Sequence, residues 1–499
     1  MAIFSPVTET LLHLCGTVVV IYGLRKIVLL YQSRTRLPPG PFPWPVVGNL
    51  LSFRKNKFGH EILAEMGSKY GPVFAIYLSH MPAVVITDPE IGIQVLKKHT
   101  FAGRPTIFSD LLFFEKGSID IVMADFGKEW EALRKVGHSA ARKFAVSPQL
   151  SPMVTDAVDR VIARVGDQPC DSDETFAILM IAILAKSAFG KKYTFEDPEF
   201  LRWKAAFDGV RKMNTYMMLI LLLPVLKYVL RSKWNTLMSH INYQREYVQM
   251  MYKMNEDNYY DGKNESFCDA IITAKKEAEE SENWMTPHLR PQNLLNTIGD
   301  LFSAGTDTTR LTLRWIFLMM AKQSDLQEKM RKNVEHEIGD MEPAIDDKDK
   351  LPLVCAFISE TMRFRPIVPG GVPHKATVDE EVNGHTIPQG TAVIVMMSNA
   401  LWDSREWGDP LVFRPERFLD ADGKYVSKPN NFFIPFSDGR RSCPGNKLAF
   451  NNLFLIVTRF LQKTRDIQVV GGVTEEHLKG DLSITSGFEP IPYSLQFTL

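Results

Sequence analysis

The stretch that decides the fold is Phe436-Ser437-Asp438-Gly439-Arg440-Arg441-Ser442-Cys443-Pro444-Gly445. It places one cysteine in a glycine-punctuated turn, directly after two arginines. The segment 446–461 that follows has apolar residues at i, i+3 and i+4 spacings, which predicts a helix. Cys443 would then lie at a helix N-terminus, where the macrodipole and the two arginines favour a thiolate. A lone buried thiolate suits a haem iron that needs one protein ligand, and a plain buried cysteine is the alternative.

The spacing Phe-x-x-Gly-x-Arg-x-Cys-x-Gly is matched at Phe436, Gly439, Arg441, Cys443 and Gly445. It resembles the haem-thiolate signature of the cytochrome P-450 family. The resemblance implies that Cys443 ligates the iron of haem b and that Phe436 and Arg441 contact the cofactor, Arg441 at a propionate. It also implies a mainly α fold with small β-sheets (α+β), with a long central helix over the haem.

Residues 292–323 predict this central helix, because they are apolar on several sides. Its middle carries Ala304-Gly305-Thr306-Asp307-Thr308-Thr309. Thr308 lies four residues after Ala304, so its hydroxyl can bond that carbonyl and open a notch for a diatomic ligand. The motif is similar to the family's oxygen-activation motif, which implies that Asp307 and Thr308 relay protons and that Ala304 faces the substrate. A tolerated kink in the helix is the plain alternative.

Two further elements are candidate haem contacts. Trp130 and Arg134 lie four residues apart on one helix face, so both can reach one anion such as a haem propionate. They resemble the family's Trp-x-x-x-Arg element, and stacking at the surface is the alternative. The prolines and glycines of 366–374 exclude a helix and predict an extended strand past the haem. Its Val368 and Pro369 would face the substrate, and His374 would donate to a propionate unless it is an ordinary loop histidine.

Other positions have a predicted structural or substrate-contacting role. Glu360 and Arg363, three residues apart, resemble the family's Glu-x-x-Arg element, which implies that they lock to Arg417 and fix the scaffold. The aperiodic aromatic run 108–114 is either core or a loop lining an apolar cavity. If the run lines a cavity, Phe108, Leu111 and Phe114 are further substrate contacts. Residues 484–486 resemble the turn that closes the pocket in the family, which implies that Thr485 also contacts the substrate.

Composition excludes several other classes of protein. The 499 residues include 58 basic and 58 acidic side chains, so no overall charge attracts nucleic acid. Five scattered cysteines are too few for a disulfide framework, and no CxxC or HExxH motif indicates zinc. No flavin or nicotinamide motif is found, so electrons must come from a partner.

Three regions are expected along the chain. Residues 1–31 form an N-terminal membrane anchor, because an apolar run is followed by arginines and lysine, which places the remainder in the cytosol. A cleaved signal peptide is the competing interpretation. Residues 32–47 are a basic, proline-rich hinge, and 48–499 a single haem-binding catalytic domain.

Local patterns predict smaller features of that domain. Residues 73–78 and 83–87 form one hairpin and 382–397 another. Residues 255–291 are polar and predict a solvated connection. The apolar run 217–229, broken by Pro224, is either core or a lip that dips into the bilayer.

The resemblance covers essentially the whole chain and is greatest to the animal microsomal group that contains steroid 17-alpha-hydroxylase and the drug-metabolising enzymes. It implies a monooxygenase that inserts one oxygen atom of dioxygen into a lipophilic, steroid-like or xenobiotic substrate at the endoplasmic reticulum membrane.

NADPH-cytochrome P-450 reductase is the expected electron donor and cytochrome b5 a second candidate. A basic patch for the donor is predicted at Lys135, Arg142, Lys143, Arg440 and Lys447, with scattered solvated charges as the alternative. A haem-thiolate isomerase or dehydratase and a non-catalytic haem carrier or sensor are the rivals. The motifs leave the substrate and the position of oxidation open.

Overall fold

The computed structural model describes residues 34–53, 57–105, 117–263, 265–482 and 487–499, together with single positions between 14 and 32. Most of the predicted anchor therefore lies outside the described residues, as do Phe108, Leu111, Phe114 and Thr485. Within the described part of the chain, no helix has both the length and the apolar character needed to cross a membrane.

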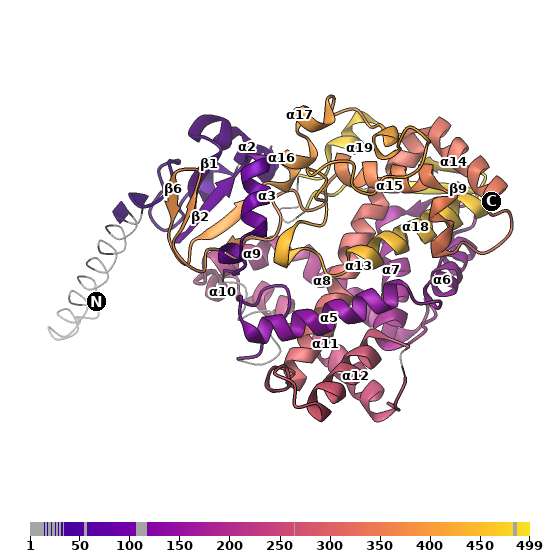
Figure 1. Cartoon of the computed structure of the whole chain (residues 1–499), viewed down its shortest axis with the longest axis horizontal. Helices are drawn as coiled ribbons and strands as arrows, with labels where there is room; N and C mark the ends of the chain where they lie inside the picture. Colours follow the sequence, from indigo (N-terminus) through magenta and orange to yellow (C-terminus); the bar gives the residue numbers. More distant parts are fainter. Residues whose placement is uncertain are drawn as a thin grey trace, which may run out of the picture.

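Most of the described chain is helical (Figure 1), as the family resemblance implies. The helices are α2 (Gly59–Tyr70), α3 (Pro89–Lys97), α5 (Lys128–Ala145), α6 (Leu150–Val165), α7 (Ser172–Phe189), α8 (Pro198–Lys212), α9 (Asn214–Leu222), α10 (Leu226–Val229), α11 (Arg231–Asp257), α12 (Phe267–Glu280), α13 (Pro291–Lys322), α14 (Ser324–Glu337), α15 (Pro352–Phe364), α16 (Met397–Leu401), α17 (Ser404–Trp407), α18 (Asn446–Lys463) and α19 (Glu475–Lys479). The break between α9 and α10 falls at Pro224, as predicted.

Three small sheets accompany the helices. The largest has the order β1-β2-β7-β4 and contains β1 (Val73–Leu78), β2 (Met81–Ile86), β4 (His374–Lys375) and β7 (Ala392–Val395). The second joins β3 (Cys170–Asp171), β9 (Ser494–Thr498) and β8 (Asp466–Val469), and the third pairs β5 (Glu380–Val382) with β6 (His385–Ile387). The first predicted hairpin is confirmed, because β1 and β2 pair antiparallel from Val73 opposite Ile86 to Leu78 opposite Met81.

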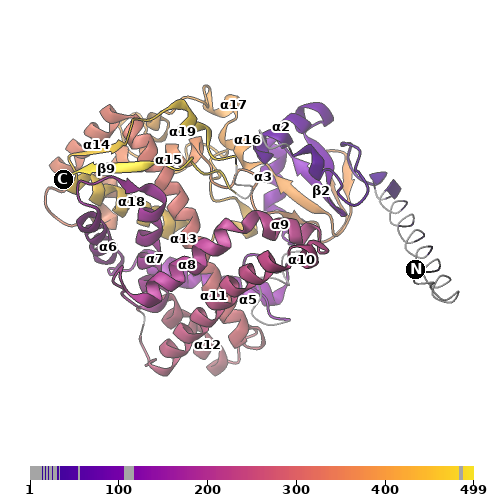
Figure 2. The ribbon, with the colours of Figure 1, turned by 180° about the vertical axis from the view of Figure 1, so that it is seen from behind.

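Helix α13 is the central element, and its bounds agree with the predicted helix. Its first residue is Pro291, which suits the first turn because the missing N–H has no partner there in any case. Along its C-terminal half nearly every side chain is buried, and α7 packs beside it through rings such as Phe176 and Phe317, whose centroids are 4.7 Å apart. In Figure 1 the strands β1, β2 and β6 lie on the side of the N-terminus, and Figure 2 shows α8, α9 and α11 across the opposite face of the molecule.

Three local predictions are wrong. The segment 366–374 is not an extended strand, because Gly371 N donates to Val368 O at 3.1 Å and Gly371 has a φ of +62°, which makes a turn before the short β4. Residues 382–397 do not form one hairpin, since β7 pairs parallel with β2 and antiparallel with β4. The polar stretch 255–291 contains α12, whose apolar side faces the core through Phe267, Cys268, Ile271 and Ile272.

Candidate active site

The cysteine loop is a tight turn that leads into α18. Cys443 N donates to Phe436 O at 2.9 Å, and α18 begins three residues later at Asn446, as predicted. Gly439 has a φ of +73°, and a Cβ on it would lie 2.0 Å from the carbonyl oxygen of Leu96. Only glycine fits there, because an added side chain would clash with the backbone at the end of α3.

The electrostatics of Cys443 differ from the prediction. Burial raises the pKa of the thiol, and the Gly445 N–H and the Arg134 guanidinium act in the opposite direction. Arg440 is exposed and pairs with Glu131 at 3.2 Å, and Arg441 is turned to the backbone. The expectation that Arg440 and Arg441 favour the thiolate is therefore wrong, and the cation that does so is Arg134 on α5.

An interior, mainly apolar cavity joins the cysteine loop to α13. Cys443 and Phe436 line one side of it, and Ala304 and Thr308 of α13 line another. The Thr308 hydroxyl donates to Ala304 O at 2.8 Å, as the spacing predicts. Asp307 is absent from the described residues that line the cavity. Its carboxylate instead accepts from Arg310 at 2.7 Å on the far side of the helix.

The turn before β4 closes the cavity on a third side. Val368 is a lining residue, as predicted, and so is Gly371. Pro369 is not among the described lining residues, and its carbonyl accepts from Ser398 N at 3.0 Å.

Three arginines, Arg104, Arg134 and Arg441, come together at one end of the cavity. Burial, followed by the neighbouring charges of Arg104 and Arg134, lowers the pKa of Arg441 to about 8. Burial and the charge of Arg134 lower the pKa of Arg104 to about 10. The charges of Asp125 and Asp120 act in the opposite direction on the pKa of Arg441. The arginines outnumber these two acids, so the cluster is suited to an anionic ligand.

Arg441 is held in place while part of it stays free. Its Nε donates to Ala102 O and its Nη2 to Ala124 O, both at 2.7 Å. Its guanidinium lies 3.8 Å from the centroid of the Trp130 ring. Its Nη1 is buried and has no hydrogen-bond partner among the described residues.

The other two predicted haem contacts point elsewhere. The Trp130 indole N–H donates to Ile121 O at 3.0 Å, so Trp130 supports Arg441 with its ring, and only Arg134 of the predicted pair lines the cavity. His374 Nδ1 lies 2.8 Å from Phe101 O, and burial lowers the pKa of His374 to about 3. A neutral imidazole that donates from Nδ1 to a carbonyl has no second N–H, so the geometry does not support donation by His374 to a carboxylate.

Comparison with known proteins agrees with this arrangement. The family model described as Cytochrome P-450 matches residues 38–470. The chain belongs to the cytochrome P-450 family. It is 30% identical to cytochrome P-450 2C16 of Oryctolagus cuniculus over 96% of this chain and 98% of that protein. It is 27% identical to steroid 17-alpha-hydroxylase/17,20 lyase of Oryzias latipes over 97% and 96%. A solved zebrafish cytochrome P-450 with progesterone superposes with a TM-score of 0.77 at 26% identity, covering 88% of this chain and 99% of that one.

The cofactor of this P-450 is therefore haem b, bound through the thiolate of Cys443, and the protein is a monooxygenase. The residues present fit the group. Cys443 lines the cavity as the sulfur ligand, and the arginine cluster with its unpartnered Nη1 of Arg441 is suited to two propionates.

Among the cavity residues that were not predicted from the sequence are Arg104 and Asp300. Arg104 follows no motif, and it is held by Val372 O at 2.9 Å and Pro373 O at 2.8 Å. Asp300 lies one turn before Ala304 on α13, and its Oδ2 accepts from Ile121 N at 3.0 Å. Burial and the charge of Asp120 raise the pKa of Asp300 well above its ordinary value. Asp300 could have been predicted from the sequence, because it precedes Ala304 by four residues and therefore lies on the same face of the helix as Ala304 and Thr308.

The structural trio predicted from the sequence is assembled. Arg363 donates to Glu360 through Nε at 2.6 Å and Nη2 at 2.7 Å, and neither side chain is exposed. Arg417 Nε lies 3.6 Å from Glu360 Oε1, and Arg414 N donates to the same oxygen at 2.8 Å. The trio thus fastens α15 to the segment that leads toward the cysteine loop.

Proposed function

We propose that this P-450 inserts one oxygen atom of dioxygen into a lipophilic, steroid-like or xenobiotic substrate, with electrons from an NADPH-dependent reductase. The observation that carries the proposal is that Cys443 and the Ala304–Thr308 notch line one cavity that is mainly apolar. When bound there, the haem supplies oxygen activation, and the thiolate promotes O–O bond cleavage.

The side chains of the chain have separate tasks in this proposal. Cys443 holds the iron, and Arg104, Arg134 and Arg441 hold the propionates, which fixes the orientation of the cofactor. Val368 and Ala304 contact the substrate and help to exclude water. The Thr308 hydroxyl passes protons to the reaction site, with Asp307 as the acid behind it.

The electron donor docks on the cysteine side. A groove beside Phe436 and Pro444 is lined by the cationic residues Arg142, Lys348, Lys428 and Lys447, and none of its described lining residues is acidic. Lys135 and Lys143 are also exposed on α5. This supports a basic surface for an acidic flavoprotein such as NADPH-cytochrome P-450 reductase, with cytochrome b5 as a second donor.

The substrate and the location are proposed on separate grounds. Steroid chemistry is supported by the name of the fish 17-alpha-hydroxylase and by the zebrafish structure with progesterone. A single anchor in 1–31 would hold the catalytic domain on the cytosolic side of the endoplasmic reticulum membrane. Exposed Val225, Tyr228 and Val229 around α10 support contact with lipid.

Labelled oxygen tests the proposal. Spectral titration of the purified holoenzyme with a panel of steroids, fatty acids and xenobiotics, starting with progesterone, identifies compounds that enter the cavity. With reductase, NADPH and isotope-labelled dioxygen, the product is expected to carry one labelled atom. Product that forms without NADPH and carries no label would favour an isomerase or dehydratase, and binding without any product would favour a carrier.

A further inference from the structure

Arg365, the residue directly after α15, is a cation in the wall of the haem cavity that has no task in the proposed function. It is half-buried, and its Nη1 donates to Phe364 O at 2.9 Å. Its Nε is buried and has no hydrogen-bond partner among the described residues. The ion pairs of the described residues include Arg363 but not Arg365. One in-plane donor of this guanidinium is therefore left without an acceptor.

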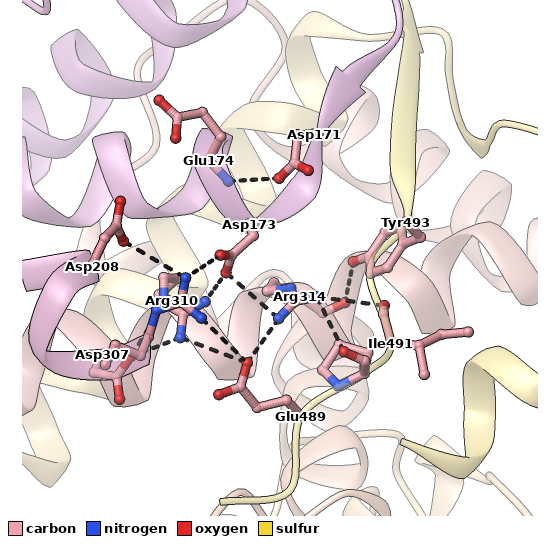
Figure 3. A network of polar contacts seen from close by, with 12 residues as sticks. Asp171, Asp173, Glu174, Asp208, Asp307, Arg310, Arg314, Glu489, Ile491 and Tyr493 are labelled. Atoms are coloured by element: carbon pink, nitrogen blue, oxygen red, sulfur yellow. Dashed lines mark hydrogen bonds and ion pairs between the residues drawn. The ribbon is translucent and has the colours of Figure 1, made fainter. Parts of the chain in front are cut away.

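The buried arginines of the neighbouring α13 have carboxylate partners. Figure 3 shows Arg310 beside Asp173, with which it forms an ion pair. The same view shows Arg314 beside Glu489, where Nη1 lies 3.0 Å from Oε2. A cation that loses its water without gaining a partner is unfavourable, so this pairing is the ordinary arrangement. Arg365 departs from it, which points to a partner that is not part of the chain.

The charges that act on Arg365 do not compensate it. Burial, followed by the charge of Arg363, lowers the pKa of Arg365 to about 10, and Glu475 acts in the opposite direction. Glu475 is 84% exposed and already lies 3.1 Å from Lys322 Nζ. An exposed carboxylate with its own cation is a weak counter-charge for a second one.

Three aromatic rings hold the face of the guanidinium and leave its edge free. The Arg365 Cζ lies 3.9 Å from the centroid of the Phe364 ring, 5.5 Å from that of Trp315 and 5.8 Å from that of Phe488. Two of the rings are fixed in turn, because Trp315 Nε1 donates to Phe488 O at 2.8 Å. Rings attract the face of the cation, whereas its N–H donors lie in its plane. The stacking therefore orients Arg365 without satisfying Nε.

Haem does not supply the missing anion. The charges of Arg104 and Arg134 affect the pKa of Arg441, whereas the charge of Arg363 affects that of Arg365. Arg365 thus lies apart from the three arginines that are suited to the two propionates. It stays without a counter-charge when the cofactor is bound.

Arg365 lies within reach of the expected substrate. Val368, which the proposed function places against the substrate, follows it by three residues, and both line the cavity. Three residues of chain span at most about 11 Å, so a molecule that contacts Val368 can extend to Arg365. Thr312, one turn after Thr308 on α13, lines the same cavity.

We propose that Arg365 selects lipophilic substrates that carry one anionic end group, a carboxylate or a sulfate. This proposal rests on the proposed function and names the class of substrate that enters its cavity. The anion accepts hydrogen bonds from Nε and the adjacent edge of the guanidinium, whose planar donors match two oxygens of one anionic group. The apolar body of the substrate then lies against Val368 and Ala304.

Spectral titration of the holoenzyme with matched pairs of ligands tests the proposal without turnover. Dodecanoic acid is compared with 1-dodecanol for the carboxylate, and pregnenolone sulfate with pregnenolone for the sulfate. The wild type is expected to bind the anion of at least one pair about tenfold more tightly than its neutral partner, as charge-assisted hydrogen bonds allow. Arg365→Gln should abolish this preference and leave the Kd of the neutral ligand unchanged. The control is Arg164→Gln, the same change at an exposed arginine, which should keep the preference.

The two pairs also identify the anion, since a preference in one pair alone assigns the end group to carboxylate or to sulfate. Equal Kd values within both pairs for the wild type, or a preference that survives Arg365→Gln, would overturn the proposal. If Arg365→Gln does not retain haem, Arg365→Lys decides the question. Lysine keeps the charge but lacks the planar fork, so its preference should be several-fold smaller, and an unchanged preference would assign the selection to another cation.

Failure of this proposal is distinguishable from failure of the proposed function. The titration uses neither reductase nor NADPH, so an enzyme that inserts no oxygen would still show the preference for the anion. Conversely, an enzyme without the preference would still insert labelled oxygen into a neutral substrate.

Discussion

Replacing Glu360 by glutamine removes one negative charge from a fully buried cluster while keeping the shape of the side chain. The carboxylate accepts two hydrogen bonds from Arg363, at 2.6 and 2.7 Å, and one from Arg414 N at 2.8 Å. Breaking a buried ion pair by removing one partner costs about 3 to 5 kcal/mol. Arg363 keeps the carbonyls of Leu401 and Pro410 as acceptors, so we expect the lower end, about 3 kcal/mol, or about a hundredfold in the unfolding equilibrium.

Urea unfolding followed by circular dichroism measures this loss, and the Soret absorbance reports whether the haem stays bound. The matched control is Glu196→Gln, because Glu196 and Arg164 form an exposed pair, 76% and 44% accessible, that is expected to contribute nothing measurable. We expect Glu360→Gln to lose stability and to release haem at lower urea than the control. Equal unfolding midpoints for the two variants would refute the reasoning that burial makes the Glu360–Arg363 pair important for stability.

Three more predictions use the same protein. The pKa of His374 is lowered from 6.5 to about 3, so between these pH values the unfolded chain binds a proton that the folded chain does not, and stability should fall as the pH falls. The dependence of the unfolding free energy on pH, measured by urea titrations at several pH values, should decrease in His374→Gln by up to one proton. An unchanged pH dependence would contradict the burial of a neutral imidazole. Thr308→Ala should lower the product formed per NADPH consumed, and unchanged coupling would remove Thr308 from the relay. Arg441→Gln should weaken haem retention in competition with apomyoglobin, because it removes a propionate contact. Lys447→Glu should leave haem retention unchanged and raise the KM for reductase, because it reverses a charge on the proposed docking surface. The reverse pattern would contradict the propionate role of Arg441 and the docking role of Lys447.

Local sequence patterns predicted much of the fold. The helix of 446–463, the long α13 and the β1–β2 hairpin depend on periodicity and turn residues within one short stretch, and each lies where it was predicted. Long-range pairing could not be predicted in this way. Residues 392–395 pair with β2, which is remote in sequence, so the neighbouring 380–387 forms its own small hairpin.

The candidate site shows the same division. Cys443, Thr308 and the Glu360–Arg363 pair belong to motifs with fixed spacing, and the structure brings Cys443 and Thr308 to one cavity and pairs Glu360 with Arg363. The cation beside Cys443 is Arg134 and not the expected Arg440 or Arg441. Arg104 belongs to no motif, and only the folded chain brings it to Arg134 and Arg441. Two partners of Arg310, Asp173 of α7 and Glu489 of the C-terminal segment, are remote in sequence, so no local pattern could have indicated them.

The most direct test of the account is the absorption spectrum of the reduced carbon-monoxide complex. A thiolate from Cys443 as the ligand of the iron predicts a strongly red-shifted Soret band for the wild type. The shift should be lost in Cys443→Ala and kept in Cys355→Ala, where the cysteine is buried away from the cavity in α15. An unshifted band in the folded wild-type holoenzyme, or a shifted band that survives Cys443→Ala, would contradict the central claim.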